Sequence, residues 1–122
     1  MIDDDRHLIE AIGQFLKLKG LEFDGLTDPS QAAARARLFR PDIMLLDVQF
    51  PDGSGWDVCR ALKSDPSLGH IPVIMVSGRY GGAVDKAKGL ELGADDYLSK
   101  PFDVEVLILK IEAILRTAER HG

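Results

Sequence analysis

The sequence predicts an α/β fold of three layers, in which helices cover both faces of a doubly wound parallel sheet. Two apolar runs, "IMLL" at 43–46 and "IPVIMV" at 71–76, are continuous, as is typical of strands buried on both faces. Segments with apolar residues at helical spacing stand between the strand segments. Strands that alternate with helices form parallel βαβ units. The 122 residues suffice for a core, and we expect one domain over 1–122.

The expected elements follow one another without a linker, repeat or low-complexity segment. Helices are expected at 5–20, 28–39, 55–65, 82–93 and 103–120, and strands at 21–27, 42–47, 71–78 and 95–100. The first helix is expected to end at Gly20. Its expected core face holds Leu8, Ile12, Phe15 and Leu16.

Two further helices carry informative signals. Asp28 as N-cap, Pro29 at the first helical position and Gln31 at capping-box spacing mark the start of the second helix. The last helix is apolar on two faces. Its core stripe is expected to be Val104, Leu107, Ile108, Ile111, Ile114 and Leu115. The opposite face holds Val106, Leu109 and Ala113, which form either a homodimer surface or scattered exposed apolar residues.

Composition argues against several classes of protein. The net charge of -5 and the pI of about 5.1 argue against a nucleic-acid-binding module, so we expect no direct nucleic acid partner. No apolar run approaches the ~20 residues of a membrane span, so we expect no membrane partner. A single cysteine, Cys59, cannot form an internal disulfide, which fits a reducing cytoplasm.

Polar side chains stand at the carboxyl ends of the expected strands. Asp3 and Asp4 lie near the start of the chain, Asp47 follows "IMLL", Ser77 follows "VIMV" and Lys100 follows "DYLS". Ligands of such sheets bind at this edge, so we expect these side chains to converge. Clustered carboxylates repel one another unless a cation or proton offsets them, and their oxygens suit Mg²⁺. A carboxylate beside that ion can attack phosphorus and form an acyl phosphate.

Four segments together resemble the receiver domains of two-component response regulators. They are "DDDRHLI", "IMLLDVQFPDGSG", "VIMVSG" and "GADDYLSKPF", in the order and spacing of that family. The resemblance covers nearly the whole chain. It implies a flavodoxin-like, five-stranded parallel sheet of order 2-1-3-4-5 with five helices.

The resemblance also implies a role for each polar residue at the sheet edge. Asp47 is the expected phosphoacceptor, and the donor is a histidine kinase or a histidine phosphotransfer protein. Asp4 and Asp47 are expected to bind Mg²⁺, or Mn²⁺ in its place, directly, and Asp3 through water. Gln49 is expected to lend its backbone carbonyl to the ion. Ser77 is the expected switch hydroxyl.

Further roles come from the same resemblance. Lys100 is the expected partner of the phosphoryl group, and the Lys100–Pro101 bond is expected to be cis. Tyr97 is the expected switch aromatic, although plain packing on a short strand is an equal alternative. Gln49 and Arg79 are expected to tune the lifetime of the phosphoryl group. Phosphorylation would change the surface of the last two helices and the last strand.

The start of the chain departs from the family pattern. Only Met1 and Ile2 precede Asp3, where a full apolar strand is expected in the centre of the sheet. We therefore expect the first strand to be truncated, and a natural chain that begins a few residues upstream.

Two alternatives to a phosphorylation switch remain. One is a receiver-like interaction module that is never phosphorylated, which the short first strand favours weakly. The other is a Mg²⁺-dependent phosphatase with an aspartate nucleophile. That chemistry requires an acid two residues after Asp47, where Gln49 cannot protonate a leaving group. We do not expect a metabolic enzyme.

Overall fold

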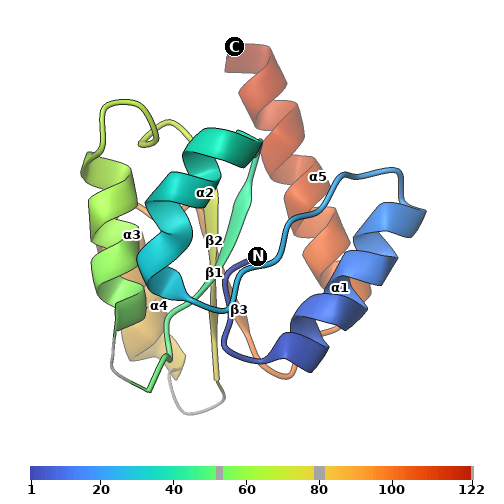
Figure 1. Cartoon of the computed structure of the whole chain (residues 1–122), viewed down its shortest axis with the longest axis horizontal. Helices are drawn as coiled ribbons and strands as arrows, with labels where there is room; N and C mark the ends of the chain where they lie inside the picture. Colours follow the sequence, from blue (N-terminus) through green and yellow to red (C-terminus); the bar gives the residue numbers. More distant parts are fainter. Residues whose placement is uncertain (52–53, 79–81, 122) are drawn as a thin grey trace.

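A three-stranded parallel sheet lies between two layers of helices (Figure 1). The computed structural model of the chain describes residues 1–51, 54–78 and 82–121. The strands, in spatial order, are β1 (Met44–Asp47), β2 (Val73–Ser77) and β3 (Asp96–Ser99). One face is covered by α1 (Arg6–Leu18) and α5 (Val104–His121). The other is covered by α2 (Ala32–Phe39), α3 (Ser54–Ser64) and α4 (Gly82–Glu91). The doubly wound architecture and the five predicted helices are confirmed.

The edge of the sheet next to β1 is built differently from the prediction. Ile2 forms isolated parallel bridges to Leu26 on one side and to Leu46 of β1 on the other. The predicted strand at 21–27 is wrong, because these residues pair only at Leu26. A strand needs a neighbour along its length. Before Asp3 only Met1 and Ile2 are available in this chain, where Met1 hydrogen-bonds to Asp24 and Leu26 and Ile2 forms the bridge. The five-strand order 2-1-3-4-5 is therefore not confirmed, although Ile2 lies between Leu26 and β1 as that order requires.

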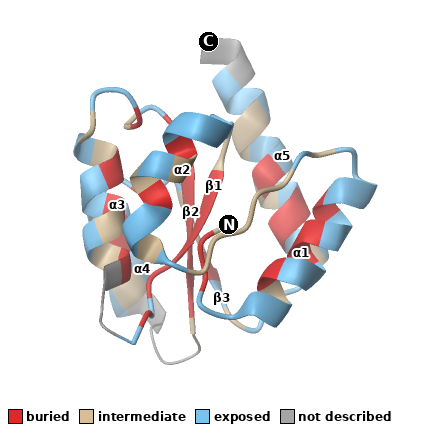
Figure 2. Cartoon of the chain, viewed as in Figure 1, coloured by how far each residue is buried: buried red, intermediate tan, exposed pale blue. Residues whose placement is uncertain are grey.

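The alternation of side chains along the strands separates two cores. Leu46 and Met75 point into a cluster with residues of α2 and α3. Leu45 and Ile74 point the opposite way, into a cluster with α1 and α5. Figure 2 shows the buried residues of β1 and β2 running through the middle of the molecule. Both strands are buried on both faces, as their continuous apolar sequences predicted.

The predicted core faces of the helices are confirmed with one exception. The N-cap of α1 is Asp5, whose side chain accepts a hydrogen bond from the Leu8 N–H. The buried residues of α1 are Ile9, Ile12, Gly13 and Leu16. The placement of Phe15 on the core face is wrong, since this side chain is 47% exposed. The buried stripe is centred on the 9–12–16 line, and Phe15 falls at its margin, where Leu16 already fills the core.

The start of α2 follows the sequence pattern at Asp28 and Pro29, but the predicted capping role of Gln31 is wrong; the two faces of α5 agree with the prediction. Asp28 caps a short 3₁₀ turn (Pro29–Gln31) that leads into α2, and Gln31 makes no side-chain cap. The predicted core stripe of α5 is buried at its centre, at Leu107, Ile108 and Ile111. On the opposite face Val106, Leu109 and Ala113 are exposed.

A cavity of about 420 Å³ lies beside Met1, at the amino ends of the strands. Its apolar lining includes Leu16, Phe39, Ile43, Ile111 and Leu115. This cavity is at the end of the sheet opposite Asp47. Within the described residues, no helix combines the length and the apolar character that crossing a membrane requires.

The start of α3 packs directly against the backbone that follows β1. Gly55 is buried, and a methyl group on its Cα would lie 2.3 Å from Val48 Cα and 2.7 Å from the Val48 carbonyl carbon. Only a residue without a side chain fits between these two backbones. The contact therefore fixes the position of α3 relative to the end of β1.

We expect Gly55→Ala to lower the free energy of unfolding by about 1–3 kcal/mol, because backbone atoms cannot move aside for the methyl group. Gly89→Ala is the matched control. Its methyl group would meet the flexible end of Met75, with Sδ at 2.4 Å, and alanine favours the helix by about 1 kcal/mol. Urea denaturation of both variants checks this, and an equal loss in the two would show that the Val48 contact is unimportant.

Candidate functional site

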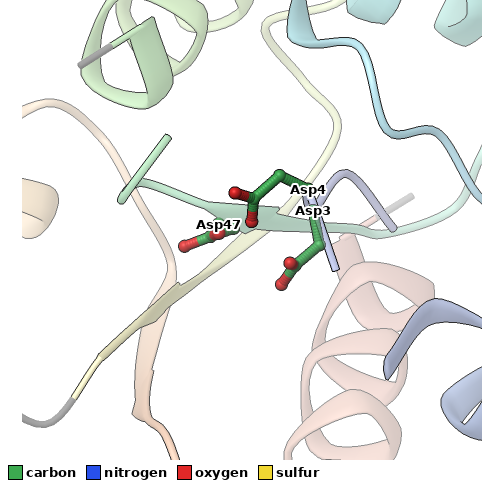
Figure 3. Close-up of side chains that lie close together, drawn as sticks. All are labelled: Asp3, Asp4 and Asp47. Atoms are coloured by element: carbon green, nitrogen blue, oxygen red, sulfur yellow. The ribbon is translucent and has the colours of Figure 1, made fainter. Parts of the chain in front are cut away.

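Three carboxylates meet at the carboxyl end of β1. Oxygen atoms of Asp3, Asp4 and Asp47, one from each residue, lie within 4.8 Å of one another. Figure 3 shows the three side chains gathered beside the end of the strand. Asp47 is the last residue of β1, and Asp3 follows the bridged Ile2. Asp3 and Asp47 are buried, at 0% and 2% exposure, whereas Asp4 is exposed. The predicted convergence of these acids is therefore present in the structure.

Lys100, which follows β3, brings positive charge to this cluster. Its Nζ donates a hydrogen bond to Asp3 Oδ2 at 2.7 Å and lies 3.6 Å from Asp47 Oδ2. Among the ion pairs of the described residues, only those of Lys100 reach these acids. One ammonium group thus faces three carboxylates, and the cluster keeps an excess of negative charge when all are ionised.

Backbone N–H groups orient the two buried acids. The Asp5 N–H donates to Asp3 Oδ1 at 2.8 Å, and the Gln49 N–H donates to Asp47 Oδ1 at 3.0 Å. In both cases the carboxylate caps the residue two positions ahead, a common turn geometry for aspartate. Each acid therefore keeps its second oxygen, Oδ2, for the space near Lys100.

Burial and neighbouring charges shift the pKa values of Asp47 and Lys100. Burial raises the pKa of Asp47 above its ordinary value, and the charges of Asp3 and Asp4 raise it further, against the Gln49 N–H and Lys100. Burial alone would lower the pKa of Lys100, but the hydrogen bond to Asp3 and the charges of Asp3, Asp47 and Asp4 outweigh it and raise that pKa. The ammonium group of Lys100 therefore stays protonated and positively charged at neutral pH.

The end of β2 is connected to both neighbouring segments. Ser77 is fully buried, and its hydroxyl donates to Asp85 Oδ2 at 2.8 Å rather than to the acids at β1. The next N–H, that of Gly78, donates to the side-chain Oε1 of Gln49 at 2.6 Å. The carbonyl of Ser77 accepts the N–H of Lys100 at 2.6 Å. The role of Asp85 was not predicted, because no local pattern links an acid to a serine eight residues earlier in the sequence.

Of the remaining predicted residues, Tyr97, Lys100 and Pro101 lie at or near the carboxyl edge of the sheet, and Arg79 lies outside the residues that the structure describes. Tyr97 stands on β3 and packs against the cluster that contains Leu46. Its hydroxyl oxygen is buried and has no hydrogen-bond partner within the described part of the chain. The Lys100–Pro101 peptide bond is cis.

The donor set suits a hard divalent cation. Three carboxylates close together offer oxygen ligands, and the exposure of Asp4 leaves room for water and a further ligand. The cluster contains no thiolate or imidazole among the described residues, and those ligands are the ones that zinc and copper prefer. The donor set is therefore of the kind that oxygen-preferring metal ions use.

Comparison with known proteins decides the family. The family model of the response regulator receiver domain matches residues 1–112. The chain belongs to this family. The receiver domain is also similar to solved structures: it superimposes with a TM-score of 0.89 on a CheY-like receiver domain protein from Methanospirillum hungatei, with 26% identity, covering 99% of this chain and 94% of that one. The BeF3-activated DrrB receiver domain gives a TM-score of 0.79 with 26% identity, over 94% and 93% of the two chains.

Longer regulators are among the relatives of this receiver domain. It is 36% identical over 98% of its length to the DNA-binding dual master transcriptional regulator RpaA of Synechocystis, and covers 49% of that protein. It is 39% identical over 98% of its length to the DNA-binding response regulator MtrA of Mycolicibacterium smegmatis, and covers 50% of it. The chain therefore spans about half the length of these curated relatives, which are named as regulators and not as metabolic enzymes.

The names of these relatives correct one prediction. The acidic composition led us to expect no nucleic acid partner, yet RpaA and MtrA are both named as DNA-binding proteins. The net charge of -5 describes the surface of this chain only. It carries no information about the parts of RpaA and MtrA that this chain does not match, so the exclusion was wrong as a statement about partners.

Asp47→Asn is expected to stabilise the metal-free domain at neutral pH, because it removes a carboxylate whose pKa is raised by burial and by the charges of Asp3 and Asp4. A raised pKa means that the folded state binds more protons than the unfolded state between 3.8 and the folded value. Wild-type stability therefore falls as the pH rises through that window, and the asparagine variant avoids this fall. Below 3.8 the two proteins should be equally stable. Urea denaturation in EDTA across this range measures the difference.

Asp57→Asn is the control, because it removes the same charge from an exposed position on α3. A gain of equal size in this variant would assign the effect to net charge. No gain in Asp47→Asn would show that burial of the Asp47 carboxylate costs the fold nothing.

Proposed function

We propose that residues 1–122 form a receiver domain that accepts a phosphoryl group on Asp47. The donor is a phosphohistidine of a sensor kinase or of a phosphotransfer protein. The single observation that carries the proposal is the placement of Asp47 at the end of β1, with the carboxylates of Asp3 and Asp4 within 4.8 Å and Lys100 Nζ at 3.6 Å. This arrangement combines a nucleophile, a cation-binding set and a fixed positive charge.

The reaction exchanges one bond to phosphorus for another. An oxygen of Asp47 forms the new P–O bond while the P–N bond of the phosphohistidine breaks. The imidazole nitrogen leaves with the electron pair and takes up a proton from water. Lys100 stabilises the phosphoryl oxygens, and its raised pKa keeps it charged for this role. Positioning and neutralisation of charge provide most of the catalysis.

The acids beside Asp47 are suited to Mg²⁺, or to Mn²⁺ in its place. Asp4 and Asp47 would bind the ion directly, Asp3 would bind it through water, and Gln49 would offer its backbone carbonyl. When bound, the ion offsets the negative charge of the carboxylates and of the phosphoryl oxygens. The excess negative charge of the cluster supports this assignment, because Lys100 alone does not balance it.

Phosphorylation would act as a switch. The new phosphoryl oxygens attract hydrogen-bond donors, of which the Ser77 hydroxyl is the proposed one, and Tyr97 would move with it. The change would reach the surface formed by α4, β3 and α5. The side chains of Gln49 and Arg79 would tune the lifetime of the phosphoryl group. The domain assists its own phosphorylation and dephosphorylation, in the reducing cytoplasm that its single cysteine fits.

The domain should gain the mass of one phosphoryl group when incubated with acetyl phosphate and Mg²⁺. We expect the gain to disappear in EDTA and in Asp47→Asn, since the acceptor oxygen and the ion are both required. Intact-mass spectrometry measures it. Asp57→Asn, altered on the exposed side of α3, should be phosphorylated like the wild type. If folded wild-type protein stays unmodified, or if Asp47→Asn is modified equally, the proposed acceptor is wrong.

Mg²⁺ should raise the melting temperature of the domain, because an ion that binds only the folded state stabilises it, by about 2.7 kcal/mol at a hundred times its Kd. We expect Asp4→Asn to abolish this increase. Asp5→Asn is the matched control, because Asp5 caps α1 and asparagine can cap a helix equally well. Differential scanning fluorimetry with and without Mg²⁺ compares the three proteins. An undiminished increase in Asp4→Asn would exclude Asp4 as a ligand.

A further inference from the structure

Two hydrogen-bond donors at the carboxyl end of β2 are bonded to acceptors other than Asp47. The buried hydroxyl of Ser77 donates to Asp85 Oδ2, and the N–H of Gly78 donates to Gln49 Oε1. Asp85 belongs to the first turn of α4, and Gln49 follows Asp47 in the loop after β1. The Ser77–Gly78 segment is therefore tied to α4 through one bond and to the β1 loop through the other.

The second bond depends on the absence of a side chain at Gly78. A methyl group there would lie 2.3 Å from Gln49 Oε1, which is closer than any ordinary contact. Glycine thus allows the amide oxygen to approach the backbone N–H to 2.6 Å. The contact joins the loops after β1 and β2 directly.

These bonds compete with a phosphoryl group. A serine hydroxyl carries one proton, so Ser77 cannot donate to Asp85 and to a phosphoryl oxygen at the same time. The Gly78 N–H is likewise a single donor. A phosphoryl group on Asp47 brings three strong acceptor oxygens to the neighbourhood. Any movement of this segment toward Asp47 must first break the bond to Asp85, the bond to Gln49, or both.

We propose that Asp85 and Gln49 form a latch that holds Ser77 and Gly78 in their unphosphorylated arrangement. The proposal rests on the proposed function and adds its regulation. Asp85 is a positioning residue that acts through the Ser77 hydroxyl. Because Asp85 is part of α4, release of the hydroxyl also frees the first turn of that helix from the end of β2. The latch thereby couples events at Asp47 to α4 and sets the threshold for switching.

The test measures binding of beryllofluoride, a mimic of the acyl phosphate, in the presence of Mg²⁺. The fluorescence of Trp56, the single tryptophan, follows the titration. Asp85→Ala should bind about tenfold more tightly than the wild type, since a hydrogen bond to a charged group is worth about that factor. Asp85→Asn keeps an acceptor without the charge and should fall between the two. Asp57→Ala, which removes a charge from the first turn of α3, should resemble the wild type.

A second arm separates the latch from simple charge repulsion. In a Ser77→Ala background there is no hydroxyl to release, so Asp85→Ala should bring no gain in affinity. A gain that persists in this background would assign the effect to repulsion between Asp85 and the anion and would overturn the latch. Unchanged or weaker binding in Asp85→Ala alone would overturn it as well.

A third arm needs no phosphorylation and keeps the two proposals distinguishable. The Gly78 N–H should exchange slowly with solvent deuterium in the wild type, and at least about tenfold faster in Gln49→Ala. Rapid exchange in the wild type would overturn the latch whether or not Asp47 is phosphorylated. If exchange behaves as expected but wild-type protein binds no beryllofluoride, the proposed function fails and the bonded arrangement of this segment stands.

Discussion

Asp3 and Asp47 are both buried, and one ammonium group, that of Lys100, contacts the two of them. Charges removed from water are costly unless an opposite charge lies close, so this pairing constrains the rest of the site. The three groups come from the first residues of the chain, the end of β1 and the residue after β3. The parallel order of the strands is what brings them to one edge. The other groups of the site act on the same three charges. The Gln49 N–H donates a hydrogen bond to Asp47, and the exposed Asp4 adds a further negative charge near Lys100.

Much of the carboxyl edge of the sheet could be predicted, because the sequence patterns that indicate it involve residues close together in the chain. Continuous apolar runs identified β1 and β2, and the polar residue that ends each run identified Asp47 and Ser77 as candidates. Parallel strands place their carboxyl ends together, so convergence followed from element order alone. The helices could be predicted for the same reason, since their apolar spacing and the cap at Asp28 are patterns of a few neighbouring residues.

What could not be predicted depends on contacts between distant segments. The stretch 21–27 has strand-like residues, but a strand exists only where a neighbour pairs with it, and here only Leu26 finds one. Phe15 has the right spacing for the core, yet packing of the whole helix left it exposed. The contact of Ser77 with Asp85 joins β2 to α4 and depends on where α4 begins. Composition likewise could not report on partners of a longer protein.

The close contact of Gly55 with the Val48 backbone makes the site mechanically asymmetric. On the α3 side, backbone meets backbone with no atom between them that could yield, so this side behaves as a rigid wall. On the α4 side, the connections are hydrogen bonds of Ser77 and Gly78, whose donors can exchange one acceptor for another. If the end of β1 shifts, it meets close-packed backbone on the α3 side and hydrogen bonds on the α4 side. The absence of a side chain at Gly55 therefore favours movement on the α4 side.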